Sequence, residues 1–407
     1  MNTGGRPTVK PRFIISALAL VSLAAPLAAE SVATPFQAST GGAAGTDSLA
    51  QFTPASDRRE HRIDYEHWTE ALTWLVVPMG PSIREGAPRA TPGTGTRFVY
   101  GHTSRYRLEG NRVAFTYLTD EIRAALTEYR QDLERVGSEL DLARLPRNEQ
   151  LAYWLNLHNV AVIEALAYHY PMRTPDDRRF GPNQARLEDA KLVTVKGIEL
   201  SPRDIREQIV YKNWNDPKVM YGFWRGDIGG PSIQRLAFTG GNVDQLLDHS
   251  AEEFVNSLRG VESFGGALQV SQIYQEGESY FFPTEAALRA HLRKYAGEDV
   301  KELIAKNDQI AFNRYETDVA DLVYGRADPG LSFVCSPISS DIPAASGDTD
   351  ATSKCADQAT RPNRAEQRLM DERAEKLNKA YKRGIRIGTV IYGDGQYGEG
   401  QTVQEVE

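Results

Sequence analysis

Two short segments carry the side chains that could do chemistry in this 407-residue chain. The first, residues 153–159, reads Tyr-Trp-Leu-Asn-Leu-His-Asn inside a long helical pattern, and the second, residues 225–232, reads Arg-Gly-Asp-Ile-Gly-Gly-Pro-Ser. Asn156 and Asn159 stand three residues apart, so they share one face of an otherwise apolar helix. Because a buried amide without partners costs about 1–3 kcal/mol, each must bond either an irregular backbone segment or a ligand. The sequence leaves both interpretations open.

Other side chains in these segments are candidates for catalysis or ligand contact. His158 could act as a general base, although a single helical histidine is more often a packing residue. Asp227 lies among three glycines, where it could contact a ligand or cap its own turn. Ser232 could supply a hydroxyl, and Arg225 could hold a ligand carboxylate or form an ion pair. The catalytic candidates are His158, Asp227 and Ser232, and the ligand-binding candidates are Asn156, Asn159, Arg225 and Asp227.

No familiar metal or cofactor motif accompanies these residues. The sequence has no His-Glu-x-x-His, Gly-x-Ser-x-Gly, Ser-x-x-Lys or phosphate-binding loop, and its 7 histidines are widely scattered. Gly393, Gly395 and Gly398 spell Gly-x-Gly-x-x-Gly, but too few residues follow to form the helix that a dinucleotide site needs. We expect neither a metal site nor a cofactor.

The elements that must position these segments are predicted over residues 63–325. A continuous helical pattern from Pro146 to Tyr170 holds the two asparagines, and residues 218–224 predict a buried strand that leads into the glycine loop. Hairpins are expected at 105–115 and at 191–200. Further helices are predicted at 64–77, from Thr119, and at 241–258, 284–295, 299–305 and 366–383, with strands at 268–274 and 310–315. We predict an α+β fold in which helices pack on a small, mainly antiparallel sheet, as a single large domain.

The N-terminal residues have the features of a secretory signal peptide, predicted over residues 1–29. Three basic residues precede an apolar run over 13–27, which is short for a bilayer span and is followed by small residues typical of a cleavage site. We expect cleavage after Ala29 or Ala33, a flexible linker over residues 30–62, and no later membrane span. The protein is therefore predicted to be periplasmic or secreted in a bacterium.

Residues 326–407 are expected to form a C-terminal extension with a disulfide loop, one helix and a glycine-rich tail. Cys335 and Cys355 are the 2 cysteines of the chain, and in an oxidising compartment we expect them to pair. A redox-active pair is the alternative. The formal net charge is −8 and the basic runs are diluted with acidic residues, so we expect no nucleic-acid partner.

The first segment and its surroundings resemble a bacterial and plant family called domain of unknown function 547. The helix of that family reads roughly Ala-Phe-Trp-Ile-Asn-Leu-Tyr-Asn-Ala, and residues 152–160 here read Ala-Tyr-Trp-Leu-Asn-Leu-His-Asn-Val. Later landmarks are similar at Leu200-Ser201, Asp216-Pro217 and Ala237-Phe238-Thr239. The resemblance covers roughly residues 118–315 and implies no settled activity.

The departures from the family pattern affect the expected chemistry. In the family the strand carries a histidine and the next loop reads Asn-Cys-Gly-x-x-Ser-Cys-Pro, a set that suggests a thiol hydrolase. Alignment on Pro231 places Met220 at the histidine, and Arg225 and Gly230 at the two cysteines. Because a thiolate reaction needs sulfur, the resemblance implies that this chemistry is lost here. His158 replaces a tyrosine, so it inherits no family role as a base.

We therefore expect an exported protein that binds a ligand or scaffolds partners in the cell envelope. Its cleft would lie between the helix of Asn156 and Asn159 and the loop at 225–232. The alternative is a hydrolase of envelope peptides or glycans that uses the catalytic candidates and water, without a cysteine nucleophile. A third interpretation is a structural envelope component that binds other proteins through Trp68 and Trp74.

Overall fold

The computed structural model describes residues 8–9, 48–55, 62–89, 99–326, 363–386, 389–392 and 403–406. It confirms a mixed α+β fold in which helices predominate. The longer helices are α1 (Glu66–Leu75), α2 (Asp120–Glu139), α3 (Arg147–His169), α5 (Val243–Val255), α8 (Glu285–Tyr295), α9 (Glu298–Lys306) and α11 (Arg364–Lys382). The shorter α-helices are α4 (Tyr211–Asn213), α6 (Ile273–Glu276) and α7 (Glu278–Phe281), and η6 (Asp204–Val210) is π-helical. The 3-10 helices are η1 (Ser48–Phe52), η2 (Phe115–Tyr117), η3 (Leu142–Arg144), η4 (Pro175–Asp177), η5 (Leu187–Asp189) and η7 (Pro217–Gly222).

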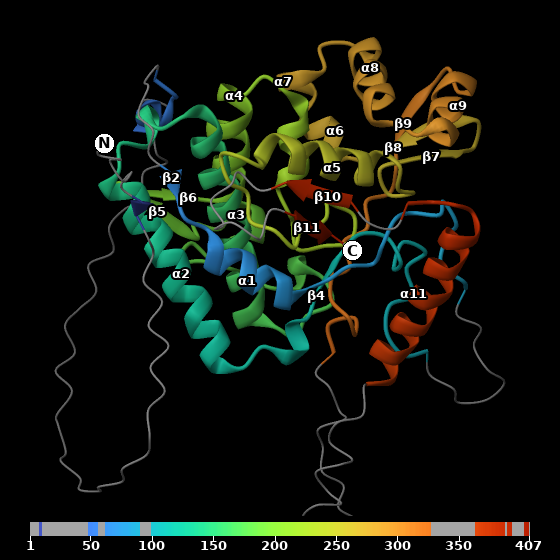
Figure 1. Ribbon diagram of the computed structural model, residues 1–407, viewed down its shortest axis with the longest axis horizontal. Coiled ribbons are helices and arrows are strands. Elements are labelled where there is room, and N and C mark those ends of the chain that lie inside the picture. The colour runs from blue at the N-terminus through green and yellow to red at the C-terminus, as the bar shows by residue number, and fades with distance from the viewer. Residues whose placement is uncertain are drawn as a thin grey trace, which may run out of the picture.

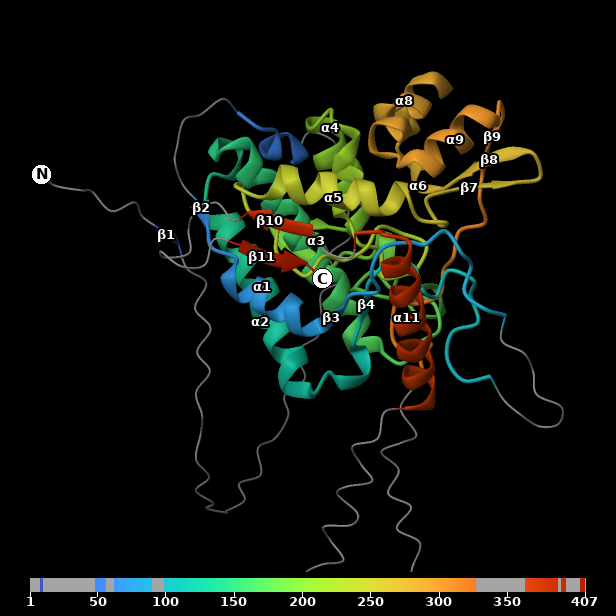
Figure 2. The ribbon, with the colours of Figure 1, turned by 45° about the vertical axis from the view of Figure 1, so that its right-hand side comes forward.

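Helix α3 forms the centre of the fold because apolar side chains occur on all of its sides. Its side chains are buried from Glu149 to Glu164 without interruption, and a helix of this kind must be enclosed by other elements. Helices α2 and α5 both pack against it. In Figures 1 and 2, α3 lies in the middle of the ribbon, between α2 and α5.

The strands form five small sheets among the described residues. The strands are β1 (Thr8–Val9), β2 (Arg62–Ile63), β3 (Val76–Val77), β4 (Arg112–Val113), β5 (Val193–Val195), β6 (Ile198–Leu200), β7 (Val261–Phe264), β8 (Ala267–Val270), β9 (Ile310–Phe312), β10 (Thr389–Tyr392) and β11 (Val403–Val406). Strand β8 pairs antiparallel with β7 and parallel with β9, beside α8 and α9 (Figure 1). The other sheets are pairs, of which β1–β2 is parallel. Strands this short cannot form a core, so the helices pack mainly on one another.

Several local predictions are confirmed, because their start and turn signals are strong. The hydroxyl of Thr119 accepts a hydrogen bond from the Ile122 amide and caps α2. The hairpin of β5 and β6 turns at Lys196 and Gly197, whose φ angles are 52° and 75°. Positive φ at both turn residues suits the twist of a two-residue hairpin.

The predicted hairpin at 105–115 is wrong. Strand β4 pairs with β3 instead, and the preceding residues wrap around the fully buried side chain of Arg112. Its guanidinium donates to the carbonyl oxygens of Gly110 at 2.8 Å and Arg107 at 2.7 Å. A buried guanidinium needs these acceptors, and backbone that turns to supply them cannot also form a ladder.

The predicted strand at 218–224 is also wrong over most of its length, because η7 occupies residues Pro217–Gly222. Asp216 accepts a hydrogen bond from the Lys218 amide at 3.0 Å, and Pro217 occupies the first helical position. These are helix-start signals, and they prevail over the apolar pattern that predicted a strand.

Helix α11 packs against the rest of the fold rather than extending from it (Figure 1). Leu369 belongs to a small apolar cluster with Met79 and Val323. Tyr381 of α11 is 77% exposed, whereas Lys376 is buried and donates to the carbonyl oxygens of Gly80 and Leu108. The predicted disulfide lies outside the described residues. Of the predicted glycine-rich tail only the backbone of β11 is described, and of the predicted signal peptide only the backbone of β1.

Within the described part of the chain, no helix has the length and apolar character that crossing a membrane requires.

Candidate functional site

Asn156 and Asn159 both hold irregular backbone against α3. Asn156 donates to the Phe238 carbonyl at 2.7 Å and accepts from the Phe238 amide at 3.1 Å. Asn159 donates to the Gly222 carbonyl at 2.9 Å and accepts from the Trp224 amide at 3.0 Å. Both ends of each buried amide are therefore used by backbone, which is the loop-holding arrangement that the sequence left open beside ligand contact.

His158 is fully buried and acts as a neutral hydrogen-bond partner. Its Nε2 lies 3.3 Å from Arg206 Nη1 and its Nδ1 lies 3.1 Å from Asn159 Oδ1. A guanidinium only donates, so Nε2 accepts and Nδ1 carries the proton. Burial, together with the nearby Arg206 charge, lowers the pKa of His158 to about 3. The ring packs edge-on against Phe223, with the two ring centroids 4.8 Å apart.

Arg206 joins His158 to two carboxylates. It lies on η6, is fully buried, and donates from Nε to Glu276 Oε1 at 3.2 Å and from Nη2 to Glu188. Burial works against the charge of Glu276, yet Arg225 and Arg206 lower its pKa to about 2. Glu188 likewise has a lowered pKa, because the same two guanidiniums outweigh its burial. Both carboxylates are therefore charged partners of buried arginines.

Arg225 connects this network to a polar pocket. Its Nη1 donates to Glu276 Oε2 at 2.7 Å. Among the described residues, neither Nε, which is buried, nor Nη2 forms a hydrogen bond. Burial opposes the charge, but Glu276, Tyr315 and Glu188 raise the pKa of Arg225 well above its usual value. The pocket has a volume of about 480 Å³, and its walls come from Arg203, Glu207, Arg225, Gln272, Ile273, Gln275, Glu276, Ser279, Tyr280 and Tyr315.

Asp227 lies next to this pocket through its contact with Tyr315. Its Oδ1 accepts from the Tyr315 hydroxyl at 2.8 Å and from the Gly230 amide at 2.9 Å. Burial raises the pKa of Asp227 to about 7, although these two bonds and Arg225 act in the opposite direction. The carboxyl thus caps its own turn and also changes its charge near neutral pH.

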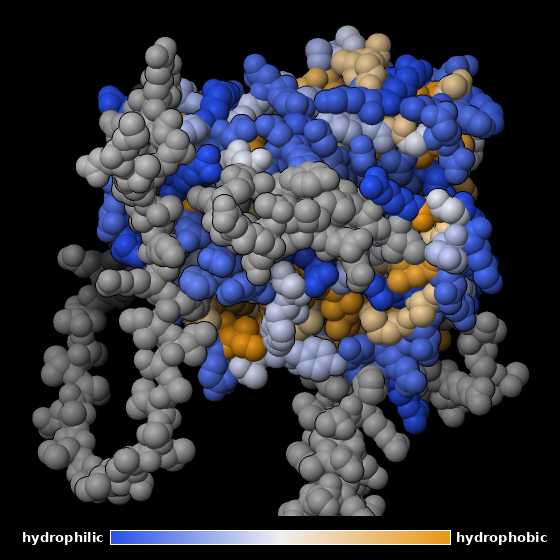
Figure 3. Space-filling view, viewed as in Figure 1, coloured by the Kyte–Doolittle hydropathy of each residue, from blue (hydrophilic) through white to orange (hydrophobic). Residues whose placement is uncertain are grey.

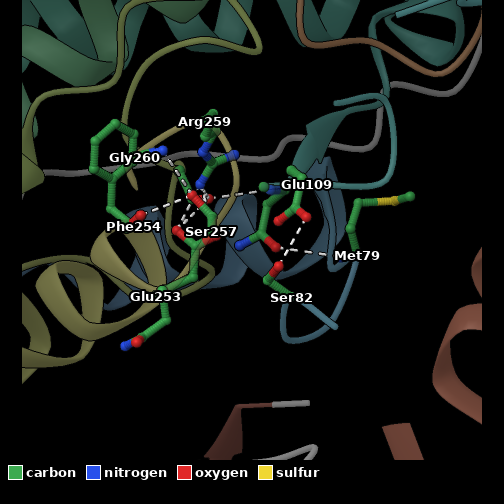
Figure 4. Close-up of polar contacts among 12 residues, drawn as sticks. Met79, Ser82, Glu109, Glu253, Phe254, Ser257, Arg259 and Gly260 are labelled. Carbon is green, nitrogen blue, oxygen red and sulfur yellow. Dashed lines mark hydrogen bonds and ion pairs between the residues drawn. The ribbon is translucent and has the colours of Figure 1, made fainter. Parts of the chain in front are cut away.

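Ser232 lies in a different cluster. Its hydroxyl accepts from Arg259 Nη2 at 2.9 Å and donates to Glu253 at 3.0 Å. Arg259 also donates to both carboxylate oxygens of Glu253, each at 2.6 Å (Figure 4). Neither atom bonded to the His158 ring belongs to Ser232. The structure therefore forms no Ser–His pair from the catalytic candidates.

A continuous chain of contacts runs from Asn159 through His158, Arg206 and Glu276 to Arg225. Four residues in or beside this chain of contacts were not predicted from the sequence, namely Glu188, Arg206, Glu276 and Tyr315. They are far apart in sequence and show no motif spacing, so only the fold could reveal them. Within the described residues, no group of three or more His, Cys, Asp or Glu side chains could hold a metal ion.

Comparison with known proteins gives a match to a family model that covers both segments of interest. No curated protein and no solved structure matches the chain. The match covers residues 142–255, which is less than the predicted stretch of residues 118–315, but it contains α3, the loop at 225–232 and α5. Residues 142–255 match the model of the family described as "Protein of unknown function, DUF547", which confirms the resemblance over that region.

Proposed function

We propose that this protein is an exported binding protein of the bacterial cell envelope, and that the pocket beside Arg225 takes a small polar ligand carrying a carboxylate. The observation that carries the proposal is the state of Arg225. One of its terminal nitrogens is held by Glu276, while Nε and Nη2 have no acceptor among the described residues. A guanidinium held in one orientation is well suited to a planar carboxylate, because its donors are already aligned.

The pocket has the size and polarity of a small-ligand site. A volume of about 480 Å³ lies within the range of roughly 300–1,000 Å³ found for such sites. Gln272, Gln275 and Ser279 offer both donors and acceptors on its walls, and Tyr280 adds an aromatic ring. These groups suit the hydroxyl and amide groups of a glycan or peptide that carries the carboxylate.

The position of Arg225 adds support from the family resemblance. Alignment on Pro231 puts Arg225 where the family pattern has its first cysteine, and in this chain the same position forms a wall of the pocket. Replacement of a thiol by a guanidinium removes a nucleophile and introduces a fixed positive charge. The family site would then be kept for binding.

The alternative, a hydrolase, has weaker support from the geometry. His158 is fully buried with both ring nitrogens bonded, and Ser232 is bonded to Arg259 and Glu253. Asp227 alone would have to activate water, and its Oδ1 is taken by Tyr315 and Gly230. A general base must reach the proton that it removes, and neither His158 nor Ser232 is placed to do so.

Isothermal titration calorimetry with three probes tests the proposal: N-acetylmuramoyl-L-alanyl-D-isoglutamine, D-alanyl-D-alanine and neutral N-acetylglucosamine. We expect at least one carboxylate probe to bind and the neutral sugar not to bind. Arg225→Gln should abolish binding, and Arg225→Lys should weaken it because the planar fork is lost. Tyr280→Ala leaves the ion pairs intact and should weaken binding through the pocket wall alone.

The matched control is Arg135→Gln, an arginine on α2 that is half exposed and paired with Asp132. It should bind like the wild type. Titrations are done well below the melting temperature of each variant, since Arg225→Gln also removes a partner of Glu276. Failure of every carboxylate probe, or unchanged binding in Arg225→Gln, would contradict the proposal.

A further inference from the structure

An apolar groove lies between α1 and α2, separate from the Arg225 pocket. It has a volume of about 690 Å³ and is lined by His67, Trp68, Glu70, Ala71, Trp74, Leu75, Ile122, Ala125, Leu126 and Tyr129. Trp68 is buried and stacks on Tyr129 with ring centroids 5.4 Å apart, so these two rings form a rigid base. Ala71 and Ala125 leave room above them, because both side chains are small.

Trp74 lies at the edge of this groove and adds exposed apolar surface to it. The Trp74 side chain is 55% exposed, whereas Trp68 is only 1% exposed, so of the two tryptophans in the third interpretation only Trp74 is on the surface. Figure 3 shows orange, hydrophobic surface between the positions that α1 and α2 occupy in Figure 1. A large exposed aromatic side chain beside an apolar groove is typical of a protein interaction site.

The margins of the groove are acidic. Helix α1 carries Glu66 and Glu70, both exposed, and contains no lysine or arginine. On α2, Glu121 and Glu128 are exposed, and helical spacing places both on the same side of the row of Ile122, Ala125 and Tyr129.

The nearby arginines of α2 do not balance these charges at the groove. Arg130 is bonded to Glu164 of α3, and Arg123 donates to the Ala167 carbonyl of α3 at 3.1 Å. Arg123 also pairs with Asp120 at 2.6 Å and Arg130 with Glu134 at 2.8 Å, so both guanidiniums have carboxylate partners of their own. The exposed glutamates leave the margin of the apolar floor negative, and Arg235, which donates to the Thr73 carbonyl of α1 at 3.3 Å, is a basic side chain near the end of that helix.

We infer that this groove binds a basic amphipathic helix of a partner protein. Apolar side chains at helical spacing would fill the space above Trp68 and Tyr129, and lysine or arginine on the same helix would meet the acidic margins. A second copy of this chain is disfavoured because it would bring the same acidic margins, and an anionic membrane surface would be repelled in the same way.

The probe is a synthetic peptide of about four helical turns made of leucine and lysine in an amphipathic repeat. A matched peptide with glutamate in place of every lysine has the same apolar face. We expect the leucine–lysine peptide to bind the full chain and to shift the Trp74 fluorescence to shorter wavelength. Binding is also followed by calorimetry, which does not depend on tryptophan.

Two kinds of variant separate the groove from general attraction to an acidic protein. Ala125→Trp fills the groove without changing the charge, and Glu70→Lys with Glu121→Lys reverses the margin without filling it. Each should weaken binding about tenfold or more, as loss of an anchoring contact does. The control pair is Glu298→Lys with Glu302→Lys, which makes the same charge change on exposed residues of α9.

The control pair should bind the peptide nearly as the wild type does. Equal binding of the glutamate peptide, or an unchanged affinity in Ala125→Trp, would overturn the inference. Sedimentation showing a dimer of the wild type that is lost in Trp74→Ala would assign the groove to a second copy instead. None of these outcomes depends on Arg225, so the proposed function and this inference can fail separately.

Discussion

Arg206 donates from Nη1 to His158 Nε2 at 3.3 Å, inside a part of the fold where both side chains are fully buried. The contact fixes the imidazole as a neutral acceptor and gives the guanidinium one of its three partners, the other two being the carboxylates of Glu188 and Glu276. A histidine placed in this way supports a buried arginine, and it cannot exchange protons with a ligand in the pocket.

Replacing His158 by leucine should therefore destabilise the protein rather than alter any chemistry. His158→Leu introduces an apolar side chain of similar size, which fills the same space but leaves Arg206 Nη1 without its acceptor. The free energy of unfolding should therefore fall by about 2–3 kcal/mol. His158→Gln restores an acceptor and should recover part of the loss. Urea unfolding measures both, and His67→Leu on the exposed face of α1 is the control, with a change within about 0.5 kcal/mol. Equal stability of His158→Leu and wild type would contradict this role.

The sequence was informative where local signals decide the structure. Thr119 before α2, the turn at Lys196 and Gly197, and the apolar run of α3 each act through near neighbours, and all three were predicted. The strand expected at 218–224 was wrong because a local signal was overlooked. Asp216 and Pro217 start a helix there, and the prediction relied on the apolar pattern alone.

The candidate site was predicted only in part, since its ion pairs join distant positions. Asn159, His158 and Arg225 were identified from their segments, but Arg206 and Glu276 lie outside those segments. Neither has a motif or a spacing that links it to Arg225. Which arginine meets which carboxylate depends on the packing of η6, α6 and the glycine loop, and that packing cannot be read from local patterns.

Binding of a carboxylate ligand should weaken as pH rises through about 7. Burial raises the pKa of Asp227 to about 7, so this side chain is protonated below that pH and negatively charged above it, beside Tyr315 and Arg225. The charged form repels a ligand carboxylate and competes for Arg225. Calorimetry of the N-acetylmuramoyl probe should show an affinity about tenfold lower at pH 8 than at pH 6. Asp227→Asn removes the titration, and a pH dependence that persists in this variant would exclude Asp227 as its source.

His102 should stabilise the fold more at low pH than at high pH. Burial and Arg112 oppose its charge, but the carboxylates of Asp318 and Asp321 raise its pKa, and its Nε2 lies 2.7 Å from Asp321 Oδ1. Since the folded pKa is above the unfolded value of about 6.5, the stabilisation is complete below that value and is lost as pH rises through the folded pKa. The difference in unfolding free energy between wild type and His102→Gln should therefore be larger at about pH 5.5 than at about pH 9. If the difference in unfolding free energy between wild type and His102→Gln increased with pH, the pKa of His102 would not be raised in the folded protein.

The ion pair of Glu372 with Arg107 should stabilise the packing of α11 against the rest of the fold. Arg107 is only 2% exposed, and it donates to Glu372 from Nε at 2.6 Å and from Nη2 at 2.8 Å. Glu372→Gln leaves a buried guanidinium without its counter-charge, which costs about 3–5 kcal/mol, so α11 should open more often and exchange its amide hydrogens faster. Glu375→Gln makes the same change at an exposed position on the same helix and should leave exchange unchanged. Equal protection of α11 in both variants would mean that its apolar contacts around Leu369 suffice to hold it, and that the ion pair with Arg107 contributes little.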